Sequence, residues 1–433
     1  MRSASALAPL VVLLVLVAIS PGAAAWGVPI PISDPLARPE APAIAVDGSK
    51  VYAVWADDEC RFRPSGGSSG VPSDAITSIC IRRNMSGGEG DWGPTCAILP
   101  ELMVTSASEP DVAALGGTVY VVWAQQERGT EGLLGSGGHN EADIWSVRMT
   151  AWDGDCPTWY GPLVFVGQGG SGAENVPRVV TDGVYAHIAL LGDGPLGYQP
   201  WYYRWDGVFL GDPTRTVRQL TYLAEAESLA IALSGPGLGR VTVAFSCRPT
   251  NNVAGVWEVD AVSSADGGLT WRNLNTRCTA PLSGGVGTNS VRVALAGTVG
   301  TVHLTWTEVG RISTQVYHRR SLTGGATWEA IQLISDPGLG SHRESRMAGY
   351  LNCVGIVYEG RSSGRGPEIH FRQSTNWGGS WGPQERATSG SFDRVPALSI
   401  DPRSGGGTCA LHYHVAFLRM SGETGASVYY LRE

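Results

Sequence analysis

The sequence predicts an all-β fold, and three observations carry that prediction. Of its 433 residues, 59 are glycine and only 16% are charged, a composition typical of many short strands joined by glycine-rich turns. A tight turn followed by tryptophan occurs three times within the same eight-residue pattern. A pair of apolar strands recurs seven times, at intervals of roughly 50–70 residues. Together these features predict seven four-stranded sheets in a ring, a seven-bladed β-propeller.

The turn pattern, hereafter the turn motif, is clearest at residues 264–271, which read Ser-Ala-Asp-Gly-Gly-Leu-Thr-Trp. A short Asp or Ser side chain can bond the backbone two residues on and so define a turn, and Gly adopts backbone angles that a Cβ resists. The Trp then starts a strand and packs under the turn. Copies follow at 321–328 and 374–381, and weaker versions end at Trp92 and Trp159. The predicted structural residues of the three clear copies are Ser264, Asp266, Gly268, Trp271, Ser321, Gly325, Trp328, Ser374, Asn376, Gly378 and Trp381.

These three copies resemble the Asp-box (BNR) repeat of the sialidase superfamily and of other secreted β-propellers. The resemblance implies that the motif joins the third and fourth strands of a blade, on the face away from the catalytic site. It therefore indicates a fold more strongly than a function. Sialidases have six blades, so the count of seven departs from that family, and a six-bladed sialidase-like ring is the alternative.

Each strand pair supplies the two innermost strands of one predicted blade. The first two pairs are 41–46 with 51–55 and 111–115 with 118–123, and both second strands end in Trp. Near-continuous apolar runs suit strands that are buried on both faces. The last copy ends after its third strand, whereas residues 26–35 read like the fourth strand at 328–337. We therefore expect the N-terminal strand to complete the last blade and close the ring, which removes an exposed sheet edge.

Residues 1–25 have the features of a secretory signal peptide: Arg2, an apolar run over residues 7–19, and the small residues Ala23-Ala24-Ala25. The expected organisation is a signal peptide at 1–25 and one propeller domain at 26–433. No later stretch is long and apolar enough to span a bilayer. We therefore expect a protein that is secreted or held at the exterior of the cell envelope.

Eight cysteines in an exported chain indicate disulfides. Cys60–Cys80 and Cys247–Cys278 are candidate pairs, each within one repeat. The one glycosylation sequon is Asn84-Met85-Ser86.

The net charge of −8 argues against nucleic acid and anionic membranes as partners. The histidines show no spacing typical of metal ligands, and His412 and His414 alternate along a strand as packing or surface residues do. We therefore predict no metal and no cofactor.

A polar residue lies just before each of the seven inner strands. Because these strands should all begin at the same end of the propeller, we expect the seven residues to surround one mouth of the central channel. They would offer partners to sugar hydroxyls or to a cation, and the predicted ligand is a glycan or glycoconjugate. The alternative is that the starts of strands are polar only because they meet solvent. The predicted binding residues are Glu40, Glu109, Asn175, Glu227, Asn289, Glu344 and Arg394.

The sialidase resemblance also implies three arginines that hold a carboxylate, an Asp acid/base and a Tyr nucleophile paired with Glu. Arg394-Val395-Pro396 resembles the R-I-P element of that family. The implied catalytic residues are Arg394, Glu227, Asp57 and Tyr358. Four Glu and one Arg in the predicted ring would, however, repel a carboxylated sugar.

Three functions therefore stay open. The first is a glycan-recognising propeller that also acts as a glycoside hydrolase, with paired carboxylates such as Glu40 and Glu109. The second is an exo-α-sialidase proper. The third is a non-catalytic scaffold that binds a protein partner.

Overall fold

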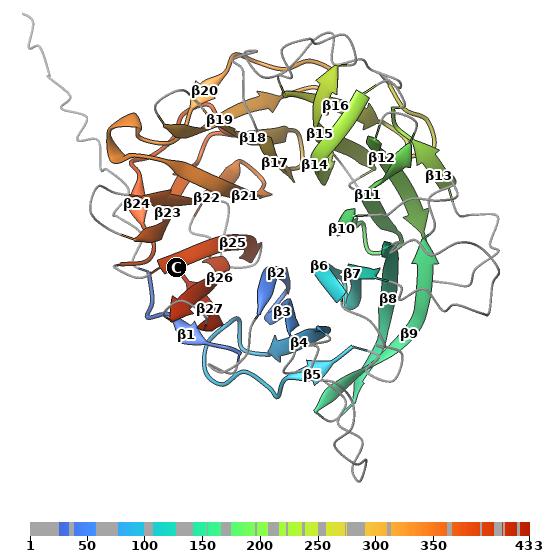
Figure 1. Ribbon diagram of the computed structural model, residues 1–433, viewed down its shortest axis with the longest axis vertical. Coiled ribbons are helices and arrows are strands. Elements are labelled where there is room, and N and C mark those ends of the chain that lie inside the picture. The colour runs from blue at the N-terminus through green and yellow to red at the C-terminus, as the bar shows by residue number, and fades with distance from the viewer. Residues whose placement is uncertain are drawn as a thin grey trace, which may run out of the picture.

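The computed structural model is a ring of seven antiparallel sheets around a central channel (Figure 1). Its sheets follow one another in chain order, so the seven-bladed β-propeller is confirmed. The structure describes residues 26–33, 39–57, 77–98, 107–126, 142–153, 155–165, 175–194, 197–206, 216–221, 224–235, 239–249, 257–272, 274, 291–309, 313–361, 366–389, 392–401, 409, 412–421 and 425–433.

The blades are numbered here from the first sheet along the chain, and their strands run from the channel outward. Blade 1 contains β2 (Glu40–Asp47), β3 (Lys50–Asp57), β4 (Ser78–Asn84) and β5 (Cys96–Ala97). Blade 2 contains β6 (Ala107–Leu115), β7 (Thr118–Gln126), β8 (Ala142–Asp153) and β9 (Cys156–Phe165). Blade 3 contains β10 (Asn175–Thr181), β11 (Ala186–Gly194), β12 (Gly197–Trp205) and β13 (Thr216–Gln219). Blade 4 contains β14 (Ala224–Ser234), β15 (Arg240–Pro249) and β16 (Glu258–Ser264).

Blade 5 contains β17 (Val291–Gly297), β18 (Val302–Val309), β19 (Thr314–Ser321) and β20 (Gln332–Leu333). Blade 6 contains β21 (His342–Tyr350), β22 (Cys353–Arg361), β23 (Pro367–Ser374) and β24 (Glu385–Arg386). Blade 7 contains β25 (Phe392–Asp401), β26 (His412–Ser421), β27 (Gly425–Arg432) and β1 (Ile30–Pro31). A short 3₁₀ helix, η3 (Pro337–Leu339), follows blade 5.

The N-terminal strand closes the ring, as the sequence predicts. Strand β1 pairs antiparallel with β27, and Ile30 lies opposite Tyr430. The N–H of Ile32 also donates to the carbonyl of Val428 at 2.8 Å. Strands from the two ends of the described chain therefore share blade 7, where β1 is the outermost strand and covers the edge that β27 would otherwise expose.

The inner strands owe their shape at the channel to a repeated bulge. In six blades two residues of the inner strand lie opposite one residue of the second strand, beginning at Ala41, Glu109, Val176, Glu227, Glu344 and Val395. The second bulge residue is Pro in four blades and Ser in two, and Pro suits a bulge because it has no N–H to donate to the ladder. Five of the first residues have a positive φ of 44–54°. Such bulges bend the strand and redirect its side chains.

The turn motif forms the hydrogen bonds that its sequence predicts. The hydroxyl of Ser264 accepts from the Gly268 N–H at 2.8 Å, and Asp266 accepts from the Thr270 N–H at 2.8 Å. The turns at 321–328 and 374–381 repeat both bonds through Ser321, Thr323, Ser374 and Asn376. The weaker version at Trp92 is a related turn in which Asn84 replaces the Ser. The version at Trp159 is not one, because Trp159 lies within β9.

The tryptophan of the motif packs against the preceding blade. Trp271 meets Tyr202 edge to face with ring centroids 4.7 Å apart, Trp92 meets Tyr430 at 4.9 Å, and Trp381 meets His318 at 5.0 Å. The motif therefore stabilises the contact between neighbouring blades as well as its own turn.

Trp377 occupies a position in this turn that other copies give to glycine. Its φ is 54° and its side chain is 47% exposed, whereas Gly267 and Gly324 have φ of 69° and 66° at the same place. Because this conformation strains a residue with a Cβ, we expect Trp377→Gly to raise the free energy of unfolding by about 0.5–1 kcal/mol. Urea denaturation would measure the change. Trp377→Ala keeps the strain and is the control, and a Gly variant less stable than the Ala variant would contradict the prediction.

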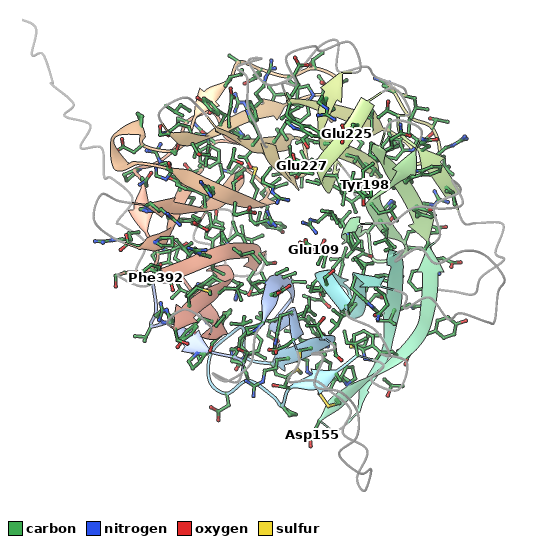
Figure 2. The ribbon with its side chains drawn as sticks, viewed as in Figure 1. Glu109, Asp155, Tyr198, Glu225, Glu227 and Phe392 are labelled. Carbon is green, nitrogen blue, oxygen red and sulfur yellow. A yellow bond between two sulfur atoms is a disulfide. The ribbon has the colours of Figure 1, made fainter. Side chains whose placement is uncertain are left out.

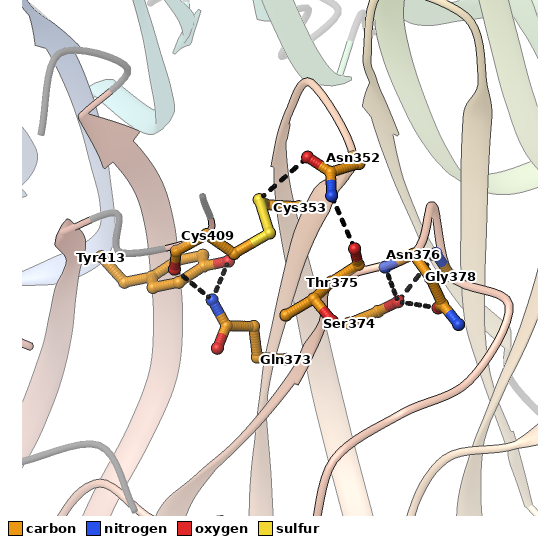
Figure 3. The surroundings of a disulfide bond; sticks show 9 residues. All are labelled: Asn352, Cys353, Gln373, Ser374, Thr375, Asn376, Gly378, Cys409 and Tyr413. Carbon is orange, nitrogen blue, oxygen red and sulfur yellow. Dashed lines mark hydrogen bonds between the residues drawn. A yellow bond between two sulfur atoms is a disulfide. The ribbon is translucent and has the colours of Figure 1, made fainter. Parts of the chain in front are cut away.

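Among the described residues, two disulfides link neighbouring blades. Cys96 of β5 bonds Cys156 of β9 and so links blades 1 and 2. Cys353 of blade 6 bonds Cys409, which lies just before strand β26 of blade 7 (Figure 3). Gln373 donates to the Cys409 carbonyl at 3.1 Å. Cys80 and Cys247 are also disulfide-bonded, but the predicted pairs Cys60–Cys80 and Cys247–Cys278 each include a residue outside the described part of the chain. Disulfides fit an oxidising, extracellular compartment.

The sequon is part of a turn rather than an exposed loop. Asn84 is fully buried, and its side chain bonds the backbone of Gly88 and Glu89. Its amide is therefore not available for a glycan in the folded protein. Within the described residues, no helix has the length and hydropathy needed to cross a membrane. The predicted signal peptide at 1–25 lies outside the described residues.

Candidate functional site

A cavity of about 460 Å³ lies in the central channel, at the end where the inner strands begin. It is lined by β2, β6, β10, β14, β17, β21 and β25, the strands nearest the centre of the ring in Figure 1. Figure 2 shows Glu109 at the edge of this channel. The charged residues that line the cavity are Glu40, Glu109, Asp111, Arg178, Arg292, Glu344 and Arg346.

Two ion pairs join neighbouring blades in the wall of the cavity. The guanidinium of Arg178 lies 3.6 Å from the carboxylate of Glu109, and that of Arg292 lies 3.6 Å from Glu344. Glu109 and Glu344 are both first residues of a bulge, with φ of 50° and 47°. The bulges therefore place carboxylates where an arginine from the next or preceding blade can reach them. Both pairs are partly exposed, so each contributes little to stability and can exchange its partner for a ligand.

Asp111 and Arg346 lie deeper, one residue past the bulges of blades 2 and 6. Asp111 accepts a hydrogen bond of 2.8 Å from the Val179 N–H of blade 3. Burial raises the pKa of Asp111, while Arg178 and backbone N–H groups oppose that shift. Burial also lowers the pKa of Arg346, with Arg178 acting in the same direction and Glu344, Glu109 and Asp111 opposing it. Arg346 therefore faces charges from blades 2 and 3 across the channel.

The structure distributes the predicted binding residues unevenly. Glu40, Glu109 and Glu344 line the cavity, whereas Glu227 and Arg394 are half-buried at the starts of their strands and are not among its described lining residues. Asn175 begins β10, but its side chain is not described, and Asn289 lies outside the described residues. The residues also do not share one register. Glu40, Asn175 and Arg394 precede the bulge, while Glu109, Glu227 and Glu344 are its first residue.

The four implied catalytic residues are on four different blades and do not all reach the cavity. Asp57 is fully buried and accepts a hydrogen bond of 3.1 Å from the indole of Trp55. Tyr358 is also fully buried, donates to Gln384 at 2.5 Å and stacks on His370. Burial raises the pKa of Tyr358. Both residues lie on second strands, β3 and β22, behind the inner strands that line the cavity, and neither is among the described lining residues.

Arg394 belongs to a charged group on blades 6 and 7 that also includes Glu344 of the cavity wall. Its charge lies close enough to the buried carboxyl of Glu359 to oppose the upward pKa shift that burial causes there. Arg361 and Arg343 oppose it too, and Glu344 adds to it. Arg394 therefore compensates a buried acid beside the channel, in addition to any contact with a ligand.

Sequence reasoning missed three of the residues that define the cavity: Asp111, Arg178 and Arg292. The described lining contains four carboxylates and three arginines, so the wall of the cavity holds more arginine than the predicted ring of four glutamates and one arginine. A signal was present in the sequence. Asp111, Arg178 and Arg292 each interrupt an otherwise apolar inner strand. A charge there is costly unless it is paired or faces a polar space.

The fold and this cavity define a seven-bladed propeller with a charged central site. No family model matches the chain, and no curated protein matches it. Among solved structures, a protein of unknown function from Dyadobacter fermentans is similar, with a TM-score of 0.52, 14% identity and coverage of 94% of this chain and 97% of that one. A Trypanosoma rangeli sialidase in complex with sialic acid has a TM-score of 0.45 at 11% identity, and this chain spans 56% of its length. At such identities the first likeness shows the fold alone.

Proposed function

We propose that this protein recognises a glycan in the cavity of its central channel. The observation that supports the proposal most is the mixed charge of the wall, with three guanidinium groups and four carboxylates around about 460 Å³. Sugar hydroxyls both donate and accept, so they can bond carboxylate oxygens and guanidinium N–H groups at the same time. A cavity of this volume is also in the range that holds a small ligand.

Glycoside hydrolysis, sialosides included, is the second candidate. Burial raises the pKa of Asp111, and the nearby Glu109 is paired with Arg178. Two carboxyl groups in such different surroundings suit the division between a general acid and an ionised partner in glycosidases. Three arginines in the wall remove the charge objection to a carboxylated sugar, and the Asp-box resemblance of the turn motif is a reason to include sialosides. Export through the signal peptide at 1–25 is part of the same proposal.

Arg346 offers the sharpest test of the binding site, because it is half-buried and faces charges on three blades. We expect Arg346→Met to weaken binding of the glycan found in an array screen by about 10- to 100-fold, the cost of losing hydrogen bonds from a charged donor. Isothermal titration calorimetry would measure the affinity of the purified mature protein. Arg218→Met, an exposed arginine on the outer strand β13, is the matched control and should bind as the wild type does.

The enzyme proposal has its own measurement. Sugar release from a panel of aryl glycosides and sialosides would be followed for the wild type, Asp111→Asn and Glu109→Gln. Turnover by the wild type that both variants lose, with glycan binding retained, would support hydrolysis. Binding without turnover would leave a lectin-like propeller. Affinity unchanged by Arg346→Met would remove the cavity from the proposal and favour a scaffold that acts through another surface.

A further inference from the structure

On the face opposite the cavity, an arginine usually closes the contact between a turn motif and the preceding blade. Arg204 of blade 3 donates to the Gly267 carbonyl of the next blade at 3.3 Å. Arg320 of blade 5 donates to the carbonyls of Asn376 and Trp377 at 3.2 and 2.8 Å. Arg432 of blade 7 pairs with Glu89 of blade 1. Each arginine lies on the third strand of its blade, opposite a histidine of the second.

Blade 4 departs from this arrangement. Ser263 takes the place of the arginine, opposite Thr242 in the place of the histidine. The short side chain leaves a pocket of about 50 Å³ between the turn of blade 4 and the turn of blade 5. Its walls are formed by Arg240, Ser263, Ser264, Ala265, Arg272, Thr323, Gly324 and Ala326.

The pocket is cationic and rich in hydroxyl groups. Arg240 and Arg272 are both exposed, and no carboxylate is among the described lining residues. In the part of the chain that the structure describes, neither guanidinium has an ion pair, in contrast to Arg320, which bonds Glu329 as well as the next turn. Gly324 allows the close approach of Arg240, since a Cβ there would lie 2.9 Å from its Nη1. Two arginines thus share one small concavity without an acid to neutralise them.

We propose that this pocket binds one tetrahedral oxyanion, a sulfate or phosphate group, either free or as an ester. Guanidinium groups bind such anions through paired N–H bonds, and Ser263 can add a hydroxyl donor. The Thr323 hydroxyl lies in the wall but bonds within its own turn. A single water requires about 10–15 Å³, so the volume suits a small anion and excludes a sugar ring. Because the turn motifs lie at the opposite end of the strands from the channel cavity, the anion site is independent of the glycan proposal.

Isothermal titration calorimetry with sodium sulfate, at an ionic strength held constant with sodium chloride, tests the site. We expect saturable binding by the wild type and at least tenfold weaker binding by the Arg240→Gln/Arg272→Gln double variant. Arg218→Gln, an exposed arginine elsewhere, should bind as the wild type does. Sulfate also stabilises proteins by exclusion from their surface. The rise in unfolding temperature of the wild type is therefore compared with that of the double variant at the same sulfate concentration. No saturable binding, or equal binding by the double variant, would overturn the proposal.

Thr323→Asp tests the site with both arginines intact. Asp266 occupies the same motif position in blade 4 and accepts the same turn bond, so the substituted chain should fold and unfold at the same or a higher temperature. The new carboxylate would face Arg240 and Arg272 and compete with the anion, so we expect sulfate binding to be lost. Sulfate binding equal to that of the wild type would count against the site. A sulfated monosaccharide compared with free sulfate and the unsulfated sugar distinguishes an ester from the free ion.

Discussion

Gly268→Ala should lower the free energy of unfolding by about 2–4 kcal/mol. An added Cβ would overlap the phenol of Tyr202 in the preceding blade, and overpacking of this kind costs about 1–3 kcal/mol. The φ of 86° at Gly268 adds roughly 1 kcal/mol of backbone strain. Tyr202 cannot easily move, because it is fully buried, bonds His187 at 2.7 Å and packs on Trp271. Urea denaturation followed by tryptophan fluorescence would measure the loss.

Gly267→Ala is the matched control for this effect. Gly267 has a similar φ of 69°, but a Cβ there would meet only the Arg204 guanidinium at 3.6 Å. We therefore expect it to cost about 1 kcal/mol, from strain alone. Equal losses in the two variants would show that contact with the preceding blade does not limit the motif, and would contradict our account of it.

We expect stability to fall steeply between pH 6 and pH 5, because burial lowers the pKa of five described histidines, four of them strongly and His342 less. Burial lowers the pKa of His318 and His414 to about 3, that of His370 to about 4, and that of His303 well below its usual value; neighbouring His or Arg charges act in the same direction. The unfolded chain binds protons at these sites below about pH 6.5, and the folded chain does not. Their stabilisation is therefore complete above pH 6.5 and is lost as the pH falls toward 3–4.

The expected slope follows from this difference in bound protons. Each histidine contributes about 1.4 kcal/mol per pH unit within that window. Glu433 offsets about one of the four strongly shifted histidines, because burial and Glu385 raise its pKa to about 7 and the folded protein takes up that proton. Burial also raises the pKa of Asp111, Glu308 and Glu359, which acts in the same direction as Glu433. The net loss from the four strongly shifted histidines and Glu433 is therefore about 4 kcal/mol per pH unit near pH 5.5. Urea titrations at pH 7, 6, 5.5 and 5 would measure it.

His318→Gln tests the cause of that slope. His318 is fully buried and bonds His303 at 3.3 Å and Gln332 at 3.3 Å. Removing it should make the slope shallower by about 1.4 kcal/mol per pH unit, whatever the variant costs at pH 7. A slope that does not change would assign the acid sensitivity to other groups.

Most of the architecture was predictable from the sequence because it depends on local and repeated features. Apolar strand pairs and the turn motif recur at regular intervals, and a strand that resembles 328–337 stands at 26–35. Each of these patterns spans only a few residues and predicts a strand or a turn without reference to the rest of the chain. The pairing of Ile30 with Tyr430 could be predicted because a ring with a missing strand leaves an edge that must be filled.

The candidate site was only partly predictable. Glu40, Glu109 and Glu344 line the cavity as the polar strand starts suggest. Asp57 and Tyr358 do not, because they lie on the second strands β3 and β22, and the inner strands β2 and β21 separate them from the channel.

The sequence by itself determined the strands, their grouping into seven blades, the motif turns and the closing strand, since these follow from periodicity and backbone preference. Only the tertiary structure decided which charges meet. The bulges shift Glu109 and Glu344 relative to Glu40 by one position, and they bring Arg178 and Arg292 of neighbouring blades to those acids. The small pocket between the turns of blades 4 and 5 also depends on contacts between blades. Ser263 leaves space there only because the turn of blade 5 forms the opposite wall. Contacts between blades join residues about 60 positions apart, and no local pattern encodes them.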